Sequence, residues 1–301
     1  ISGSVFATHI VGGEITYRCL GNVGNMNNYE ITLNVYRSCD PSSFGFDPTV
    51  RIAVYDAATL ARIDTIVIDI AGTDTLAITA DDTCYLPPAD ICYEHTAYVK
   101  QVLLPNNPNG YFIVWQRCCR NSTILNLITP LSTGMTYLAN IPSTTLCNNS
   151  STFTQQPPTY ICLGDTFIFD HGAVDPDGDS LVYAFTDPYD GTFTAGAMPD
   201  PAPPPYPPVT WAAPFGLGNI LGGTPTMSID AATGEIFAIP NQPGQFVFSV
   251  TVYEYRSGQL ISEVKRDFQL NVFFCPRNNP PEIIQPTGPQ VNGDTLYFIT
   301  G

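Results

Sequence analysis

The sequence predicts an all-β protein made of two tandem antiparallel β-sandwich domains. Three observations favour this fold class. Apolar and polar residues alternate with a period of two in many segments, clusters of Gly, Pro and Asn separate those segments, and no segment shows the pattern of a long amphipathic helix. We expect a disulfide-rich domain in residues 1–150, a second domain in residues 151–275, and a linker with the start of a further β domain in residues 276–301.

In the first domain, the alternation predicts strands at residues 9–17, 29–37, 50–54, 66–70, 97–104 and 111–117. Gly12 and Gly13 interrupt the first of these segments and indicate a bulge. The last two segments are separated by a Pro-Asn-Asn-Pro-Asn-Gly turn at residues 105–110, so we expect them to pair as a hairpin.

In the second domain, strands are expected at residues 159–169, 181–186, 225–238, 245–255 and 262–274. The last two form a hairpin around residues 256–258, with these residues facing the core: Phe246, Phe248, Val250, Val252, Phe268, Leu270, Val272 and Phe274. The composition of residues 148–158 is typical of a linker. Residues 199–208 contain seven prolines in ten and predict an extended surface segment, either a stiff loop or a ligand for an aromatic groove.

The charge balance excludes several classes of partner. The formal net charge is −16, and of the basic residues only Lys100 and Lys265 are lysines. Such a chain has no basic face for nucleic acid or anionic lipid. It also lacks a run of about 20 apolar residues that could span a membrane.

The chain contains nine cysteines, which indicates an oxidising, extracellular compartment and disulfide bonds. A bond between Cys84 and Cys92 would close a short loop, and one between Cys162 and Cys275 would join the two ends of the second domain. Cys118 and Cys119 are adjacent at a strand end, so we expect them to bond different partners. Residues 5–7 are similar to the end of a signal-peptidase site, which leaves both Ile1 and Thr8 open as the start of the mature chain.

Three carboxylates alternate in the loop before the strand at residues 181–186: Asp175, Asp177 and Asp179. Pro176 and Gly178 allow the bend that brings their oxygens together, and converging carboxylates suit Ca²⁺. The alternative is a solvated acidic turn. The spacing does not continue as an EF-hand, because Ser180 and Thr186 stand where its Gly and Glu belong. Glu254 shares the inward parity of its strand and is expected at the same end of the sandwich.

The second domain resembles a cadherin-like or Ig-like repeat. The resemblance is carried by four runs in the order of such a repeat: Asn148-Asn149 before Phe153, Ala-Val-Asp-Pro-Asp at residues 173–177, residues 228–236 and Val-Thr-Val-Tyr-Glu at residues 250–254. It implies interdomain calcium bound by Asp175 and Asp177, with Glu254 as the later acid and Asp165 as the early one. The acidic D-x-N-D-N linker of that family is missing here. We expect one or two calcium ions.

A second resemblance covers most of residues 8–275. It is carried by the runs at residues 9–17, 110–121, 175–181, 254–256 and 266–269. Together these are similar to the amino-terminal region of very large Bacteroidetes surface proteins, such as gliding-motility adhesins exported by type IX secretion. The resemblance implies a cell-surface adhesin whose amino-terminal part lies at the distal end of a long fibre and attaches the cell to surfaces or other cells.

We expect no enzyme. The three histidines stand in separate contexts without a nucleophile motif: His9, His95 and His171. We expect His171, which is near Asp170 and Asp175, to be a surface residue, with a metal ligand as the alternative. The alternatives are a carbohydrate-binding module or, less favoured, an accessory domain of a secreted hydrolase. Trp211 is the better surface candidate for binding sugar, since Trp115 alternates within a strand. Low charge, many Tyr and Phe, and sheet edges predict a homo-oligomer or fibre.

Overall fold

The computed structural model describes residues 10–39, 45–76, 91–158, 160–191 and 198–275, and the predictions for residues 276–301 and for Cys84 lie outside them. The described chain is all-β, as predicted. Its strands are β1 (Ile10–Val23), β2 (Met26–Ser38), β3 (Thr49–Asp56), β4 (Arg62–Asp69), β5 (Asp74–Thr75), β6 (Tyr93–Pro105), β7 (Tyr111–Arg117), β8 (Met135–Ile141), β9 (Thr152–Phe153), β10 (Ile161–Cys162), β11 (Phe167–Asp170), β12 (Ala173–Val174), β13 (Ser180–Phe185), β14 (Ser228–Ile229), β15 (Glu235–Ala238), β16 (Gly244–Arg256) and β17 (Gln259–Phe273). Two short 3₁₀ turns, η1 (Pro130–Ser132) and η2 (Thr144–Leu146), complete it.

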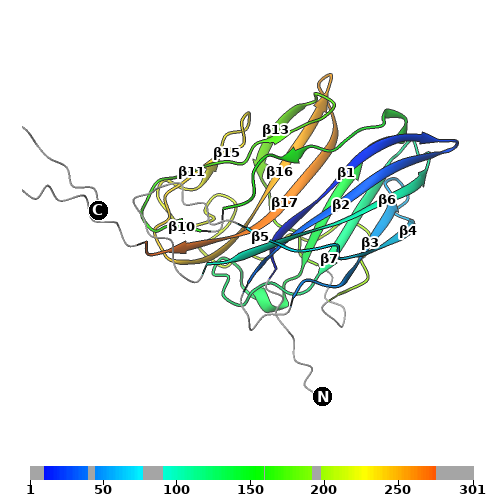
Figure 1. Cartoon of the computed structure of the whole chain (residues 1–301). Coiled ribbons are helices and arrows are strands. Elements are labelled where there is room, and N and C mark those ends of the chain that lie inside the picture. The colour runs from blue at the N-terminus through cyan, green and yellow to red at the C-terminus, as the bar shows by residue number, and fades with distance from the viewer. Residues whose placement is uncertain (1–9, 40–44, 77–90, 159, 192–197, 276–301) are drawn as a thin grey trace, which may run out of the picture.

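One large sheet runs through both halves of the chain (Figure 1). Its order is β4-β3-β7-β8-β17-β1-β2-β6-β5, and β16 and β10 also pair with β17. β17 pairs with β1 through Gly12 and Gly13, and with β8 through Val264 and Ala139. The sheet therefore crosses the predicted boundary at residue 150, and separate tandem sandwiches are not confirmed.

The first half of the chain curls this sheet around its own apolar core. Ile15, Leu33, Ile52 and Ile113 are among the fully buried members of that core. The expected hairpin of β6 with β7 is wrong, because β6 pairs with β2 and β5 while β7 pairs with β3 and β8. Alternation determines which face of a strand is buried, but two strands that face one core need not be neighbours.

The long β16–β17 hairpin organises the second core. Ser257 and Gly258, both with positive φ, form its two-residue turn, as predicted for residues 256–258. The predicted inward residues of both strands are buried, with the exception of Phe274, which is 74% exposed. Phe274 follows the last paired residue of β17, so the alternation of the strand no longer directs its side chain.

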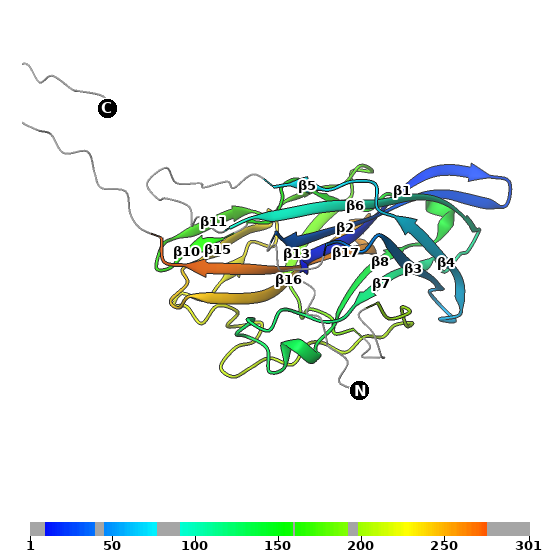
Figure 2. The ribbon, with the colours of Figure 1, turned by 60° about the horizontal axis from the view of Figure 1, so that its bottom comes forward.

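The expected linker is built into the fold, and the proline-rich segment is anchored on the sheet. Asn148, Ser150 and Ser151 of the expected linker are buried. The proline-rich segment lies against β3 and β7: Tyr206 belongs to an apolar cluster with Tyr55 and Val114, and Tyr55 donates a hydrogen bond to the carbonyl of Pro201. Figure 2 shows green and yellow loops of the middle of the chain running along one side of the sheet. Four of its prolines are exposed, as predicted for a surface segment, while Tyr206 fastens the segment to the sheet: Pro203, Pro205, Pro207 and Pro208.

The disulfides confirm one predicted pair and correct the other. Cys162 and Cys275 are bonded, with their Cα atoms 5.4 Å apart. The pairing of Cys84 with Cys92 is wrong, because Cys92 is bonded to Cys39. Ser38 pairs with Tyr93 in the ladder between β2 and β6, so the next residues outward, Cys39 and Cys92, lie opposite one another, and their Cα atoms are 5.2 Å apart.

Two further bonds differ from the expectation or add to it. Cys118 and Cys119 are bonded to each other, contrary to our prediction. β7 ends at Arg117, so the alternation of side chains in a strand does not apply to the two cysteines. Cys19 of β1 is bonded to Cys147, a pair for which the sequence gives no spacing signal.

Of the two tryptophans, Trp115 lies in the core as predicted, but Trp211 is less exposed than predicted. Trp115 is buried in the first core, as predicted. Trp211 is half-buried rather than open: it packs against a cluster that contains Leu127 and Val247, and its indole N–H donates to Asp187 Oδ1 at 2.7 Å. Trp115 therefore offers no surface for a sugar, and the ring of Trp211 is partly covered.

His171 is 1% exposed, so the expectation of a surface histidine is wrong. Its ring lies between Phe153 and Phe169, and neither ring nitrogen has a hydrogen-bond partner among the described residues. Burial, and secondarily the charge of Arg266, lowers its pKa well below the ordinary value of 6.5. The neighbouring Asp170 and Asp175 indicate a polar environment in the sequence, so this burial could not be predicted from it.

Because His171 is buried in its neutral form, the protein should lose stability as the pH falls from 7 to 5. The imidazole of His171 binds a proton more weakly in the folded protein than in the unfolded chain. Its neutral form therefore contributes fully to the free energy of unfolding above about pH 6.5. Below that pH the contribution falls, by at most about 1.4 kcal/mol for each pH unit. We expect His171→Phe to lose less stability than wild type between pH 7 and pH 5 in denaturant titrations. Equal losses would show that His171 does not titrate in this window.

Candidate functional site

The aspartate loop between β12 and β13 forms the compact turn that the sequence predicts. Asp175 Oδ1 accepts hydrogen bonds from the backbone N–H groups of Asp177 and Asp179, at 2.8 and 3.0 Å. Gly178 adopts a φ of +79°, which a residue with a Cβ atom rarely takes. One carboxylate oxygen from each of Asp175, Asp177 and Asp179 lies within 4.8 Å of the others. The three side chains therefore converge.

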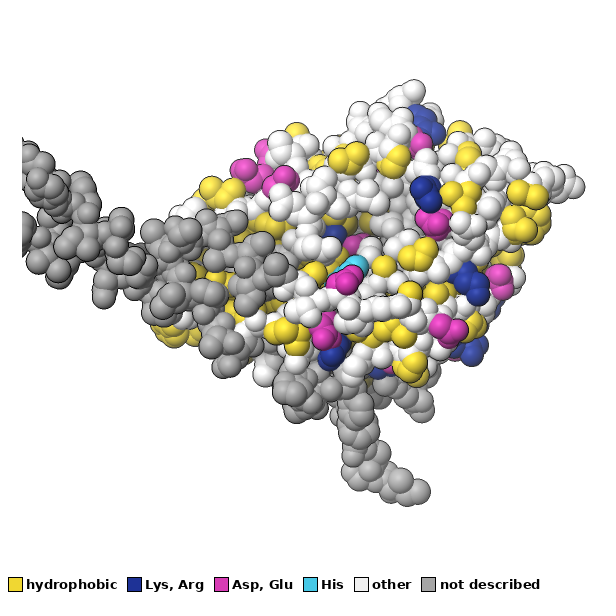
Figure 3. Space-filling model, in the orientation of Figure 1, with side chains coloured by type: hydrophobic (Ala, Val, Ile, Leu, Met, Phe, Trp, Pro, Cys, Tyr) yellow, Lys and Arg dark blue, Asp and Glu magenta, His cyan; other side chains and the backbone are white. Residues whose placement is uncertain are grey.

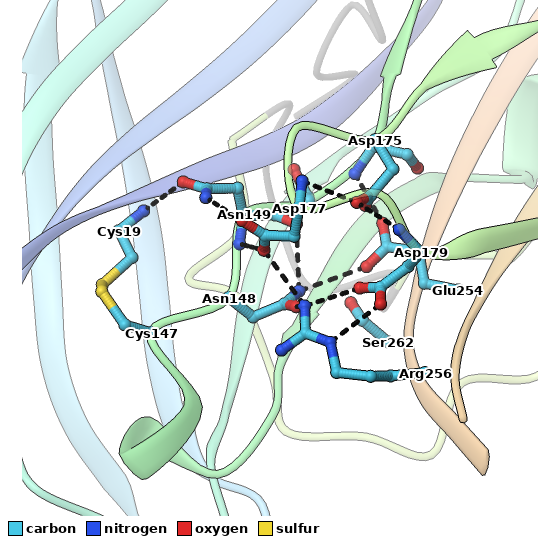
Figure 4. A network of polar contacts seen from close by, with 12 residues as sticks. Cys19, Cys147, Asn148, Asn149, Asp175, Asp177, Asp179, Glu254, Arg256 and Ser262 are labelled. Atoms are coloured by element: carbon cyan, nitrogen blue, oxygen red, sulfur yellow. Dashed lines mark hydrogen bonds and ion pairs between the residues drawn. A yellow bond between two sulfur atoms is a disulfide. The ribbon is translucent and has the colours of Figure 1, made fainter. Parts of the chain in front are cut away.

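A single arginine neutralises two of these carboxylates (Figure 4). Arg256, at the end of β16, donates from Nε and Nη2 to the two oxygens of Asp179, at 2.8 and 2.7 Å. Its Nη2 also lies 3.2 Å from Asp177 Oδ2. The pKa of Arg256 is raised, chiefly by its hydrogen bond to Asp179. The bidentate geometry makes this a directional contact between the loop and the strand.

Glu254 lies beside the cluster, on the buried face of β16. It is fully buried and pairs in register with Leu181, two residues after Asp179. Its Oε1 accepts from the backbone N–H of Ser151 at 2.5 Å, and its Oε2 accepts from Asn148 Nδ2 at 3.3 Å. Burial raises the pKa of Glu254, and the hydrogen bond from Ser151 opposes that shift. The carboxylate thus holds the 148–151 segment against the strand.

Asn148 and Asn149 complete the connection to the first half of the chain. Asn149 donates from its backbone and its side chain to both oxygens of Asp177, at 2.8 and 2.7 Å. Its Oδ1 accepts from the backbone N–H of Cys19 at 2.9 Å, beside the Cys19–Cys147 disulfide. Asn148 Oδ1 accepts from Arg256 at 2.7 Å. We call these residues, with Asp175, Asp177, Asp179, Glu254 and Arg256, the polar lock.

The donor set fits a calcium ion in part. Oxygens separated by up to 4.8 Å can share a cation that binds each at about 2.4 Å. Asp175 Oδ2 is buried and has no hydrogen-bond partner among the described residues, so it could serve as a ligand. Both oxygens of Asp179 are paired with Arg256, and both oxygens of Asp177 accept from Asn149. An ion that used all three aspartates would therefore have to displace Arg256.

Asp165 does not belong to this site. Cys162, three residues before it, pairs with Phe273 at one end of β17. The aspartate loop lies beside Tyr255, which pairs with Leu260 at the other end. Thirteen residues of strand separate Leu260 from Phe273, a span of about 40 Å. The early acid implied by the family resemblance therefore cannot reach the other aspartates.

The basic and amide members of the polar lock are not predicted by the sequence. The sequence places Arg256 in a turn and Asn148 and Asn149 in a linker, and although all three lie in runs that carry the resemblances, no contact with the aspartates is expected for them. A signal for Arg256 was present, because it follows Glu254 by two residues and so shares its face of the strand. The two asparagines gave no such signal, since their role depends on a long-range approach to the aspartate loop.

The described residues include no helix long and apolar enough to cross a membrane. Four disulfides in an all-β chain are consistent with a secreted protein. Comparison of this chain with models of known protein families, with curated proteins and with solved structures finds no match.

Proposed function

We propose that this chain is a non-catalytic structural and adhesive module of a secreted bacterial protein, located at the distal end of a long cell-surface fibre. The polar lock is the observation that carries this proposal. It joins the start of the chain at Cys19, the 147–151 segment, the aspartate loop and the end of β16. The Cys162–Cys275 bond fastens the opposite end of β17. Such cross-links suit a module that transmits pull along a fibre.

A surface location can be tested on intact cells. An antibody raised against residues 1–301 should label unpermeabilised cells, and brief protease treatment should remove both the label and attachment to a solid surface. Beads coated with the purified chain should adhere to the same surface more strongly than beads coated with an unrelated β-sandwich protein. Labelling only after permeabilisation, or equal adhesion of both kinds of bead, would contradict the proposal.

Self-association is part of this proposal. Apolar side chains are exposed at several places, including Val67 on β4 and Val99 and Leu103 on β6. Figure 3 shows apolar side chains scattered among few charged ones on the face drawn there. A fibre protein can bury such surface against further copies of itself. Sedimentation at rising concentration should therefore show dimers or larger species, and a monomer at every concentration would count against it.

We also propose calcium as a ligand of the aspartate cluster, in competition with Arg256. Removing the guanidinium frees both oxygens of Asp179 and leaves uncompensated carboxylates, so Arg256→Ala should bind Ca²⁺ more tightly than wild type. We expect calcium to raise the melting temperature of Arg256→Ala more than that of wild type. An Arg256→Ala/Asp175→Ala/Asp177→Ala variant provides the control, and an equal absence of any calcium response in all three proteins would identify the loop as a plain acidic turn.

A further inference from the structure

An open pocket lies on the face of the β16–β17 hairpin that points away from the second core. Its volume is about 320 Å³, which is at the lower end of the range for small-molecule sites. Two cross-strand pairs form its floor, Thr251 opposite Lys265 and Tyr253 opposite Glu263. The segment that follows β13 and Pro208 form its walls, through Thr186, Asp187 and Tyr189. Rigid strand residues therefore provide the floor of this pocket.

The pocket is the open end of a row of polar side chains on β17. Asp267, Gln269, Lys265 and Glu263 share one face of the strand because they are spaced by two. Farther along the row, Arg120 forms an ion pair with Asp267, and Asn121 donates to Gln269. The loop that contains Arg120 and Asn121 thus supplies hydrogen-bond partners for Asp267 and Gln269. Glu263 differs, because its half-buried carboxylate forms no hydrogen bond or ion pair with any described residue.

Lys265 is held in a fixed position at the pocket. Its Nζ donates to the carbonyl of Asp187 at 2.9 Å and lies 3.6 Å from the centre of the Tyr189 ring. Burial lowers its pKa to about 8, and the nearby charge of Glu263 partly opposes that shift. Burial likewise raises the pKa of Glu263. The pocket therefore presents one donor group and one acceptor group, neither of which is saturated by the protein.

The mixture of groups restricts the chemistry of a ligand. An anion would meet Glu263 and Asp187, and a cation would meet Lys265. A hydroxyl group can donate to Glu263 and accept from Lys265 or from a threonine hydroxyl. The ring of Tyr253 and the side chain of Pro208 offer apolar surface to the C–H groups of a sugar ring. A neutral, hydroxyl-rich ligand satisfies all of these groups at once.

We propose that this pocket binds one unit of a neutral saccharide. The proposal rests on the adhesive function above and names the class of ligand for it. Glu263 accepts hydrogen bonds from sugar hydroxyls, Lys265 donates to one, and Tyr253 packs against the ring. Trp211 takes no direct part, because its N–H is committed to Asp187, where it helps to fix the pocket wall.

Calorimetry with the full chain and methyl glycosides of neutral hexoses tests the proposal. We expect Glu263→Gln to weaken binding by roughly tenfold to a hundredfold, because a charged acceptor becomes a neutral one. Tyr253→Ala should weaken it further, while the matched control Glu235→Gln, an exposed residue of β15, should leave it unchanged. Thermal melts of each variant report whether it is folded. Binding that is unaffected by both pocket variants, or binding of anionic sugars only, would overturn the proposal.

The two lysines allow a second readout. Lys265 is 6% exposed, whereas Lys100 is exposed on β6 outside the pocket. Reductive methylation at pH 8 should therefore modify Lys100 fast and Lys265 slowly, and the bound saccharide should slow the modification of Lys265 alone. Equal modification of Lys265 with and without sugar would contradict the assignment. Beads that adhere although the chain binds no neutral sugar would overturn this inference and leave the adhesive function intact. Sugar binding without adhesion would support the inference and contradict the adhesive function.

Discussion

Asp267→Asn should lower the free energy of unfolding by about 3–5 kcal/mol, because it leaves a buried guanidinium without its counter-charge. Arg120 and Asp267 are both almost fully buried and form a bidentate pair, with Nη1–Oδ1 and Nη2–Oδ2 distances of 3.0 and 2.5 Å. Arg120 also donates from Nε to the carbonyl of Gly134. Since Asn has nearly the volume of Asp, the loss measured by denaturant titration should report the missing charge and not a cavity.

Asp200→Asn provides the matched control. Asp200 accepts from Arg62 at 2.6 Å, but its side chain is 56% exposed. Water and salt screen such a pair, and we expect a loss below about 1 kcal/mol. If the two variants lost the same amount of stability, burial would not be what makes the Arg120–Asp267 pair important. A loss below 1 kcal/mol for Asp267→Asn would likewise contradict the prediction.

Replacing both Cys162 and Cys275 with Ser should cost about 2–5 kcal/mol of stability under oxidising conditions. The bond joins residues 113 positions apart, and the Cys19–Cys147 bond closes a separate loop that does not overlap it. Loss of the Cys162–Cys275 bond therefore raises the conformational entropy of this long segment in the unfolded chain. In the folded chain it frees the short strand β10, which has only Ile161 and Cys162 paired with β17.

Hydrogen exchange should locate this second effect. The N–H of Leu163, which donates to Phe273 at 2.8 Å, should exchange faster in the double variant, while amides in β2 should keep their rates relative to global unfolding. Peptide mapping without reductant should recover the Cys39–Cys92 bond in both proteins. An unchanged unfolding midpoint in the double variant would mean that the bond is dispensable for the fold.

The local features of this protein can be predicted from its residues. Alternation identified the buried faces of β2, β3 and β16, and the Gly12–Gly13 pair identified the irregularity in β1. The turn at residues 256–258 and the convergence of the three aspartates also followed from a few neighbouring residues. Each of these depends on backbone geometry within a short stretch, where residue type directly limits the conformation.

Which of these segments contact one another depends on the packing of the whole chain. Alternation gives the face of a strand but not its neighbour, so β6 and β7 were paired incorrectly and the role of β17 in both halves was not foreseen. The approach of β2 to β6 set the partner of Cys92, and the end of β16 brought Arg256 to the aspartates. Disulfides and ion pairs form wherever two segments come within a few ångströms, and that distance is determined by the packing of the whole sheet.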